Sequence, residues 1–370
     1  MAHIVIDARI INSSTGTYVQ RLLHHLQQID REHQYTVLVP TKDLTFWQPT
    51  NPRFTVQGID VKNYSLTEQL GFRRQLDSLD ADLVHFCMPQ QPILYRGRTV
   101  TTVHDLTLLR TYNSDKNWFV FRFKQLIGRG VFRRIARTNR HIITPSEYTR
   151  REYIEFSRIS PERVTVTYEA AEPAIGVTEP YPLPSKRYLL YVGAQSDYKN
   201  IRRLAAAHQK LRATRPELGL VLVGRQDAAA RANEAHFTEQ GYQGIVFTGF
   251  LPDAQRNWLY QHADAYVFPS LMEGFGLPGL EAMAHGAPVA SSNATCLPEI
   301  YGSAARYFDP TDTDQMAATI AGVIDEEAVR QALISAGTAQ LKKYSWRRMA
   351  QQTLNVYNEA LMPSDSNTGN

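Results

Sequence analysis

Short apolar runs alternate with segments of helical spacing along the first half of the chain. Leucine and isoleucine recur every three or four positions over Tyr18–Asp30, which predicts an amphipathic helix. The apolar runs have the length of buried strands, and we expect strands at His3–Ile11, Tyr35–Pro40, Leu83–Met88, Thr99–Leu106, His141–Pro145 and Val164–Tyr168. Strands that alternate with helices predict an α/β fold with a mainly parallel sheet covered on both faces.

A proline-rich segment, Pro173–Pro184, then interrupts the pattern and predicts a linker. The alternation resumes after it, with strands expected at Tyr188–Val192, Leu218–Val223, Ile245–Phe250, Ala265–Pro269 and Pro288–Ser291. Asp312–Lys343 has helical spacing, and Trp346–Leu361 is amphipathic. We therefore expect two α/β domains, 1–178 and 186–345, followed by a C-terminal helix at 346–362 and a disordered tail at 363–370.

Composition narrows the class of protein. With 370 residues, 43% hydrophobic and 21% charged, the chain is typical of a globular protein of two domains. Its apolar runs are far shorter than the roughly 18 residues of a membrane span. The N-terminus enters a strand pattern without a charged and apolar leader, and the two cysteines, Cys87 and Cys296, lie far apart. We expect no disulfide framework and a cytoplasmic location.

The positive charge is concentrated in one segment. Residues 116–146 contain eight lysines and arginines and no acidic residue, with aromatic and aliphatic side chains between them. A helix of this composition at 116–140 could lie on an anionic membrane surface, peripherally on the inner face of the cell membrane. Equally, it could be an ordinary domain helix with a basic solvated face. Nucleic acid is not an expected partner, because no basic stripe extends beyond this segment.

The most informative stretch is the glycine-rich turn between Glu273 and Gly286, after the expected strand that ends at Pro269. Pro278 suits the start of a helix and Gly286 its end, which predicts a short helix over about Pro278–His285. Glycines at 274, 276 and 279 would let a ligand approach the main chain at the positive helix end, a geometry that binds phosphate. Glu273 and Glu281 would then accept hydrogen bonds from neutral hydroxyls, such as those of a sugar.

The same turn matches the dinucleotide fingerprint, so an NAD-dependent oxidoreductase is an alternative. That interpretation needs an acidic residue after the next strand to bind ribose, and the next strand ends in Ser291-Ser292-Asn293. We therefore favour an enzyme that uses a nucleotide sugar. A non-catalytic protein that binds nucleotide sugars is a second alternative.

These motifs resemble the retaining glycosyltransferases of family four, which have the GT-B fold. The acid–seven–acid spacing of Glu273 and Glu281 carries the resemblance, together with pieces spread over nearly the whole chain: Ile6–Arg9, Val103–Leu106, Thr144–Glu147, Tyr191–Gly193, Lys199-Asn200, Val223-Gly224, Phe247–Gly249, Leu297–Glu299 and Tyr344–Trp346. The start, with Gly16-Thr17-Tyr18, is similar to bacterial mannosyltransferases of that family. The resemblance implies two Rossmann-like domains facing a central cleft, with the C-terminal helix returning to the N-terminal domain.

The resemblance also implies a role for each matching position. It assigns His104 and Glu273 to the transferred sugar, Lys199 to the diphosphate leaving group, Glu281 to the ribose hydroxyls, Gly16 to the phosphate or the acceptor, and Gly193, Gly274, Phe275, Gly276 and Leu277 to the donor. No metal is expected, because Lys199 and the helix end supply positive charge. We interpret Asp80-Ala-Asp82 and Asp312-Thr-Asp314 as capping residues.

The resulting hypothesis is a metal-independent, retaining transfer of a sugar from a nucleoside diphosphate to an acceptor hydroxyl. The acceptor would be a growing glycan, a polysaccharide or a lipid-linked sugar. Mannose, with GDP-mannose as the donor, follows from family similarity. The chain departs from many relatives at Ala194 and Tyr198, where an arginine is common, and at Tyr168–Ala171, where an Asn-Gly turn is usual.

Overall fold

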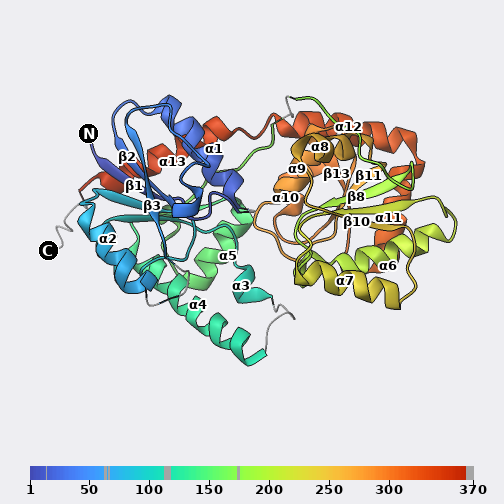
Figure 1. The fold of residues 1–370 in the computed structure, drawn as a ribbon, viewed down its shortest axis with the longest axis horizontal. Helices are drawn as coiled ribbons and strands as arrows, with labels where there is room; N and C mark the ends of the chain where they lie inside the picture. Colours follow the sequence, from blue (N-terminus) through green and yellow to red (C-terminus); the bar gives the residue numbers. More distant parts are fainter. Residues whose placement is uncertain (14, 62–64, 66, 112–117, 173–175, 364–370) are drawn as a thin grey trace. The chain divides into compact units, whose positions relative to one another are not determined.

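The computed structural model describes residues 1–370 except 14, 62–64, 66, 112–117, 173–175 and 364–370 (Figure 1). It divides the chain into two compact units, each of which is described by itself. Unit 1 contains Met1–Leu106, Gln125–Glu169 and Ser345–Asn370, and unit 2 contains Thr107–Lys124 and Ala170–Tyr344. The N-terminal part of unit 1 thus ends at Glu169, nine residues before the expected boundary at 178, and residues 107–124 group with unit 2.

Unit 1 contains a seven-stranded parallel sheet in the order β3-β2-β1-β4-β5-β6-β7. The strands are β1 (His3–Asp7), β2 (Gln34–Pro40), β3 (Phe54–Ile59), β4 (Leu83–Phe86), β5 (Thr99–Thr102), β6 (His141–Thr144) and β7 (Val164–Val166). The six strands expected in this region are confirmed, although most end two to four residues earlier than expected. The pattern missed β3, an edge strand in which Thr55 is exposed and the central residues are only half-buried.

Helices cover this sheet. They are α1 (Gly16–Ile29), α2 (Arg73–Ser78), most of α4 (Trp118–Thr138), α5 (Glu147–Ser157) and α13 (Trp346–Leu361). Although α13 comes last in the chain, it packs against α1 and also contacts β4, β5 and β6 (Figure 1). It begins at Ser345, whose side chain accepts a hydrogen bond from the Arg348 amide. Its apolar side, including Met349 and Val356, is buried.

Unit 2 contains a six-stranded parallel sheet in the order β10-β9-β8-β11-β12-β13. The strands are β8 (Tyr188–Val192), β9 (Gly219–Val223), β10 (Ile245–Gly249), β11 (Ala265–Phe268), β12 (Val289–Ser292) and β13 (Ala305–Phe308). All five strands expected here are present. The pattern missed β13, which is again an edge strand.

The helices of unit 2 are α3 (Thr107–Arg110), α6 (Ile201–Arg212), α7 (Ala228–Glu239), α8 (Asp253–His262), α9 (Leu277–Ala284), α10 (Leu297–Tyr301), α11 (Thr313–Asp325) and α12 (Glu327–Leu341). The segment expected to be helical at 312–343 is thus two helices. They are separated at Glu326, whose backbone is extended, with φ −103° and ψ 96°.

The strand order of each sheet reverses next to its first strand. In unit 1, β1 lies between β2 and β4, and in unit 2, β8 lies between β9 and β11. Ligands of open parallel sheets bind beyond the carboxyl ends of the strands at such a reversal. In unit 2 these ends lead into two loops that contain expected site residues, Gly193–Lys199 and Pro269–Gly276. Among the described residues, the structure contains no helix that is long and apolar enough to span a bilayer.

Candidate active site

The glycine-rich turn after β11 is shaped by Tyr301. The Tyr301 hydroxyl donates a hydrogen bond to the Gly276 carbonyl. A Cβ atom on Gly276 would lie 2.6 Å from that hydroxyl and from Leu297, and one on Gly279 would lie 2.3 Å from the Tyr301 ring. Gly276 also has a φ of +93°, which favours glycine. These two glycines are therefore required by packing inside the protein.

Helix α9 begins one residue earlier than expected, at Leu277, with Pro278 second. This start places Glu281 in the second turn of the helix. The Tyr260 hydroxyl donates to Glu281 Oε2 over 3.4 Å. Burial raises the pKa of the Glu281 carboxyl, and the charge of Arg256 partly offsets this effect. Glu281 is thus a half-buried acceptor beside the glycine turn.

Lys199 and Glu273 form an ion pair. The distance between Lys199 Nζ and Glu273 Oε1 is 2.6 Å, and the two side chains are 15% and 12% exposed. Burial by itself lowers the pKa of the Lys199 ammonium, but the charge of Glu273 and its hydrogen bond, together with Tyr198 and Tyr191, raise the pKa above its usual value. The ammonium also lies 5.1 Å from the centre of the Tyr198 ring. The cation expected to bind diphosphate therefore neutralises the carboxylate expected to contact the sugar.

Hydrogen bonds between the loops after β8 and β11 bring this pair together. Lys199 ends a 3₁₀ turn, and Asn200 follows it with a left-handed backbone, φ 64°. The Asn200 side-chain amide donates to the carbonyls of Pro269 and Pro310, at 3.0 and 2.7 Å. In addition, the Leu271 amide donates to the Tyr198 carbonyl. Lys199 is thereby fixed against the loop that carries Glu273.

Two further contacts fix the Glu273 main chain. Its amide donates to the Thr295 hydroxyl over 3.2 Å, and its carbonyl accepts from the Cys296 thiol. Thr295 has a φ of +58°, which is strained for a β-branched residue. Strain of this kind persists where surrounding contacts impose it, so the Glu273 loop is held rigidly.

The remaining expected donor residues lie near these loops or follow β8. Gly193 directly follows β8 with φ +148°, and its amide donates to the Val223 carbonyl. Gly274 and Phe275 lie in the glycine-rich turn, and Leu277 is the first residue of α9. Phe275 is buried, with its ring edge-on to Tyr344 at 5.8 Å.

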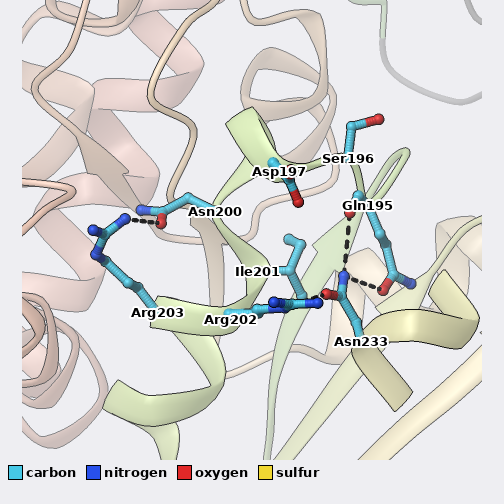
Figure 2. A pocket seen from close by; sticks show the side chains of 8 residues that line it. All are labelled: Gln195, Ser196, Asp197, Asn200, Ile201, Arg202, Arg203 and Asn233. Carbon is cyan, nitrogen blue, oxygen red and sulfur yellow. Dashed lines mark hydrogen bonds between the residues drawn. The ribbon is translucent and has the colours of Figure 1, made fainter. Parts of the chain in front are cut away.

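A polar cavity of about 390 Å³ lies beside the start of α6. Figure 2 shows its lining: Gln195, Ser196, Asp197, Asn200, Ile201, Arg202, Arg203 and Asn233. The two arginines are held by amide oxygens, Arg202 by Asn233 and Arg203 by Asn200. Neither Lys199 nor Glu273 lines this cavity, so the expected donor residues and this cavity do not coincide.

In unit 1, His104 follows β5 and is held on several sides. Its Nε2 lies 3.0 Å from the Cys87 carbonyl and its Nδ1 lies 3.6 Å from Glu169 Oε1. The Tyr18 ring meets the imidazole edge-on at 4.9 Å. Gly16 begins α1, and its amide donates to Ser13, while a Cβ atom there would lie 2.1 Å from the Ile11 carbonyl oxygen. Gly16 is therefore required by the turn before α1.

Sequence reasoning missed the residues that support the site, chiefly Tyr301, Thr295 and Tyr260. None belongs to a motif, and each acts through a contact with a residue distant in the chain. Of these contacts, only that of Tyr301 is indicated in the sequence, because the residues it contacts, Gly276 and Gly279, stand out as glycines.

The described residues contain no group of three or more histidine, cysteine, aspartate or glutamate side chains arranged to hold a metal ion. Asp312 caps α11 by accepting from the amides of Asp314 and Gln315, and Asp82 accepts from the His3 amide. Asp312 therefore caps a helix, as expected, whereas Asp82 instead holds the start of β1.

Comparison with known proteins identifies the fold and the family. The chain is similar to a solved sucrose-phosphate synthase from Thermosynechococcus elongatus, with a TM-score of 0.76, 17% identity and coverage of 97% of this chain and 99% of that one. Two parallel α/β units of this kind define the GT-B fold. "Glycosyltransferase Family 4" matches residues 15–174 and "Glycosyl transferases group 1" matches residues 180–340. The chain belongs to family 4 of the glycosyltransferases.

Two relatives come from Escherichia coli. The O-antigen chain mannosyltransferase B is 36% identical over 229 residues, which is 58% of this chain and 60% of that protein. The serotype-specific mannosyltransferase WbdA is 29% identical over 285 residues, or 72% of this chain. The matches thus span 60% and 34% of the lengths of these relatives.

The comparisons give no support to an NAD-dependent oxidoreductase. The structure agrees, because β12 is followed by Asn293 and not by an acidic residue that could bind ribose. The glycine turn of this chain is therefore a feature of a glycosyltransferase.

Proposed function

We propose that the protein transfers mannose from a nucleoside diphosphate, GDP-mannose in particular, to an acceptor hydroxyl of a growing polysaccharide or glycolipid, with retention of the anomeric configuration. The observation that carries this proposal is the ion pair of Lys199 and Glu273 at the strand-order reversal of unit 2. The names of the two relatives, both mannosyltransferases, support mannose as the sugar.

In this proposal the donor binds along the loops after β8 and β11. Lys199 and the main chain from Phe275 to Leu277, at the positive end of α9, bind the diphosphate. Glu281 accepts hydrogen bonds from the ribose hydroxyls, and Glu273 lies beside the sugar. The arrangement supplies positive charge without a metal ion.

The chemistry follows from where charge develops. The bond between the anomeric carbon and the phosphate oxygen breaks, so negative charge grows on the diphosphate and positive charge on the sugar. Lys199 and the helix-end amides stabilise the first. Because Glu273 is already paired with Lys199, it is a poor nucleophile. We therefore favour same-face displacement, in which the acceptor oxygen bonds to the anomeric carbon and its proton passes to the leaving phosphate.

A panel of donors tests the proposal. Thermal shift and transfer are measured with GDP-mannose, UDP-glucose, ADP-glucose and dTDP-glucose, each with and without magnesium. We expect GDP-mannose to raise the melting temperature most and magnesium to be unnecessary.

In Glu281→Ala, the loss of hydrogen bonds to a carboxylate should weaken nucleotide binding by about 1.5–3 kcal/mol. The matched control is Glu239→Ala, an exposed carboxylate of unit 2. Binding of no nucleotide sugar, or unchanged affinity in Glu281→Ala, would contradict the donor site.

We further propose that helix α4 attaches the protein to the inner face of the cell membrane. Its inner side is buried, through Phe132 and Ile135. On its outer side three large apolar residues, Phe123, Leu126 and Ile127, are 64%, 68% and 44% exposed. They lie at helical spacing within a segment that has no acidic residue. Apolar side chains surrounded by cations are typical of helices that bind anionic lipid.

Flotation with vesicles of phosphatidylglycerol and phosphatidylcholine tests the attachment. The double variant Leu126→Ser, Ile127→Ser and the charge reversals Arg129→Glu and Arg137→Glu should each release the protein from anionic vesicles. Arg347→Glu, on α13, is the matched control and should have no effect. If the unchanged protein does not float with these vesicles, α4 is an ordinary basic surface helix.

A further inference from the structure

A buried carboxylate faces His104. Glu169 is 7% exposed, and its Oε1 lies 3.6 Å from His104 Nδ1. The opposite nitrogen, Nε2, lies 3.0 Å from the Cys87 carbonyl oxygen. A carbonyl can only accept a hydrogen bond, so Nε2 carries a hydrogen. The nitrogen that can gain or lose a proton is therefore Nδ1, and it is the one that faces Glu169.

The parallel sheet brings these two residues together. His104 comes two residues after β5 and Glu169 three residues after β7, while β6 lies between the two strands. Strand-like hydrogen bonds continue past both strands, from the Val103 amide to Ile143 and from the Thr167 amide to Thr144. The segment after β7 therefore places an acidic side chain against the histidine.

A hydrogen-bonded network supports the other side of the imidazole. The Tyr18 ring lies edge-on to His104 and its hydroxyl is 2.9 Å from Thr102 Oγ1. Thr102 Oγ1 is 2.9 Å from His85 Nε2, and His85 Nδ1 is 2.6 Å from the Tyr357 hydroxyl on α13.

The titratable groups around His104 are Glu169, Tyr18, His85 and the adjacent Asp105. Burial, followed by the charge of His104, lowers the pKa of His85 to about 3, so His85 is uncharged at neutral pH. Burial also raises the pKa of the Tyr18 hydroxyl. Of these groups, Glu169 is the one whose carboxylate lies against Nδ1 of His104.

We propose that Glu169 is the positioning residue of His104. It fixes the ring orientation and the proton of Nδ1, as carboxylates that face an imidazole do in other enzymes. The inference rests on the proposed function, in which His104 lies beside the sugar of the donor. Glu169 itself acts through His104.

A double-mutant cycle tests this assignment. We expect Glu169→Gln to lower kcat about tenfold, while the KM for GDP-mannose changes less than about twofold. In a His104→Ala background, Glu169→Gln should change kcat by less than about twofold, because the residue through which it acts is gone. Glu162→Gln, an exposed carboxylate of the same unit, is the control. Equal effects of Glu169→Gln in both backgrounds, or no effect in either, would overturn the proposal.

A spectroscopic measurement separates this inference from the proposed function. Nitrogen-15 spectra of the imidazole rings, assigned with His104→Ala, report which ring nitrogen of His104 carries a proton. We expect the His104 signals to move in Glu169→Ala and to move less in Glu169→Gln, with the His208 signals unchanged. Identical His104 signals in all three proteins would overturn the positioning role, even in a fully active enzyme. Failure of every donor to bind would instead contradict the proposed function and leave this readout intact.

Discussion

Lys199 and Glu273 are separated by 74 positions in the chain, and each depends on the other. If Lys199 is removed, the carboxylate of Glu273 stays largely buried without a cation, and if Glu273 is removed, the ammonium of Lys199 stays largely buried without an anion. Either change is costly, because the remaining charge keeps its desolvation penalty and loses its partner. The pair therefore serves stability as well as the proposed chemistry. A loss of activity in a single variant at either position has two possible causes, which only a paired design can separate.

Such a design gives a prediction at the residue scale. Lys199→Gln should lower the free energy of unfolding of unit 2 by about 1–3 kcal/mol, which is less than for a fully buried pair because both groups are partly exposed. The double variant Lys199→Gln, Glu273→Gln should recover most of that loss, and both variants should transfer no sugar. Urea unfolding and transfer assays measure the two effects. Recovery of transfer in the double variant would show that neither charge is needed.

The sequence was informative about which residues matter here and uninformative about their contacts. Glu273, Glu281 and Lys199 stand out because their motifs have fixed spacing. Their partners do not: the Thr295 hydroxyl and the Tyr260 hydroxyl meet the site only after the chain has folded. A tyrosine or threonine outside a motif has no pattern that reveals such a contact.

At the scale of elements, α9 is positioned by its neighbour α10, which ends in Tyr301. The ring of Tyr301 lies where a side chain at Gly279 would be, so the two helices approach closely. Close approach fixes the height of the glycine turn above the sheet. The start of α9 and the orientation of Glu281 both depend on it.

We therefore predict opposite outcomes for two glycine-to-alanine substitutions in helices. Gly279→Ala should lower the free energy of unfolding by about 1–3 kcal/mol and weaken nucleotide binding, because its Cβ would overlap Tyr301. A Cβ atom on Gly130, in α4, would meet no atom within 4 Å, so Gly130→Ala should raise the free energy of unfolding by about 0.5–1 kcal/mol. Chemical denaturation of both variants checks the pair. Equal effects would mean that Tyr301 moves aside freely.

Elements were predictable where burial is complete on both faces. The central strands of both sheets appear as continuous apolar runs, and all of them were expected. Of the edge strands of the two sheets, β7 and β10 were expected, whereas β3 and β13 were missed because exposed polar residues, Thr55 and Arg306, interrupt their apolar runs. The break at Glu326 left no mark that the helical spacing could reveal. Hydrophobic periodicity therefore fails where polar residues interrupt a short element.

At the scale of the whole molecule, buried histidines make both units sensitive to acid. Burial, followed by neighbouring positive charge, lowers the pKa of His85 to about 3 and that of His141 to about 4 in unit 1. Burial also lowers the pKa of His208 to about 4 in unit 2. In the unfolded chain these groups titrate near 6.5. Between those values unfolding takes up protons, so stability falls as the pH falls.

The corresponding prediction concerns the slope of stability against pH. Between about pH 6 and 5, each buried histidine should contribute most of one proton, or about 1 kcal/mol per pH unit. His208→Gln should reduce the slope for unit 2 and leave that for unit 1 unchanged. Chemical denaturation followed at several pH values, with one probe in each unit, measures this. A slope for unit 2 that stays the same in His208→Gln would show that other groups take up the proton.

The return of α13 to unit 1 has a consequence for how the protein is made. Residues 345–361 complete a unit whose other parts were synthesised long before, while residues 170–344 form their own sheet in between. On the ribosome, unit 2 can therefore finish folding before the first sheet acquires its last covering helix. Until α13 has been synthesised, the surface of α1 that α13 covers is exposed to chaperones.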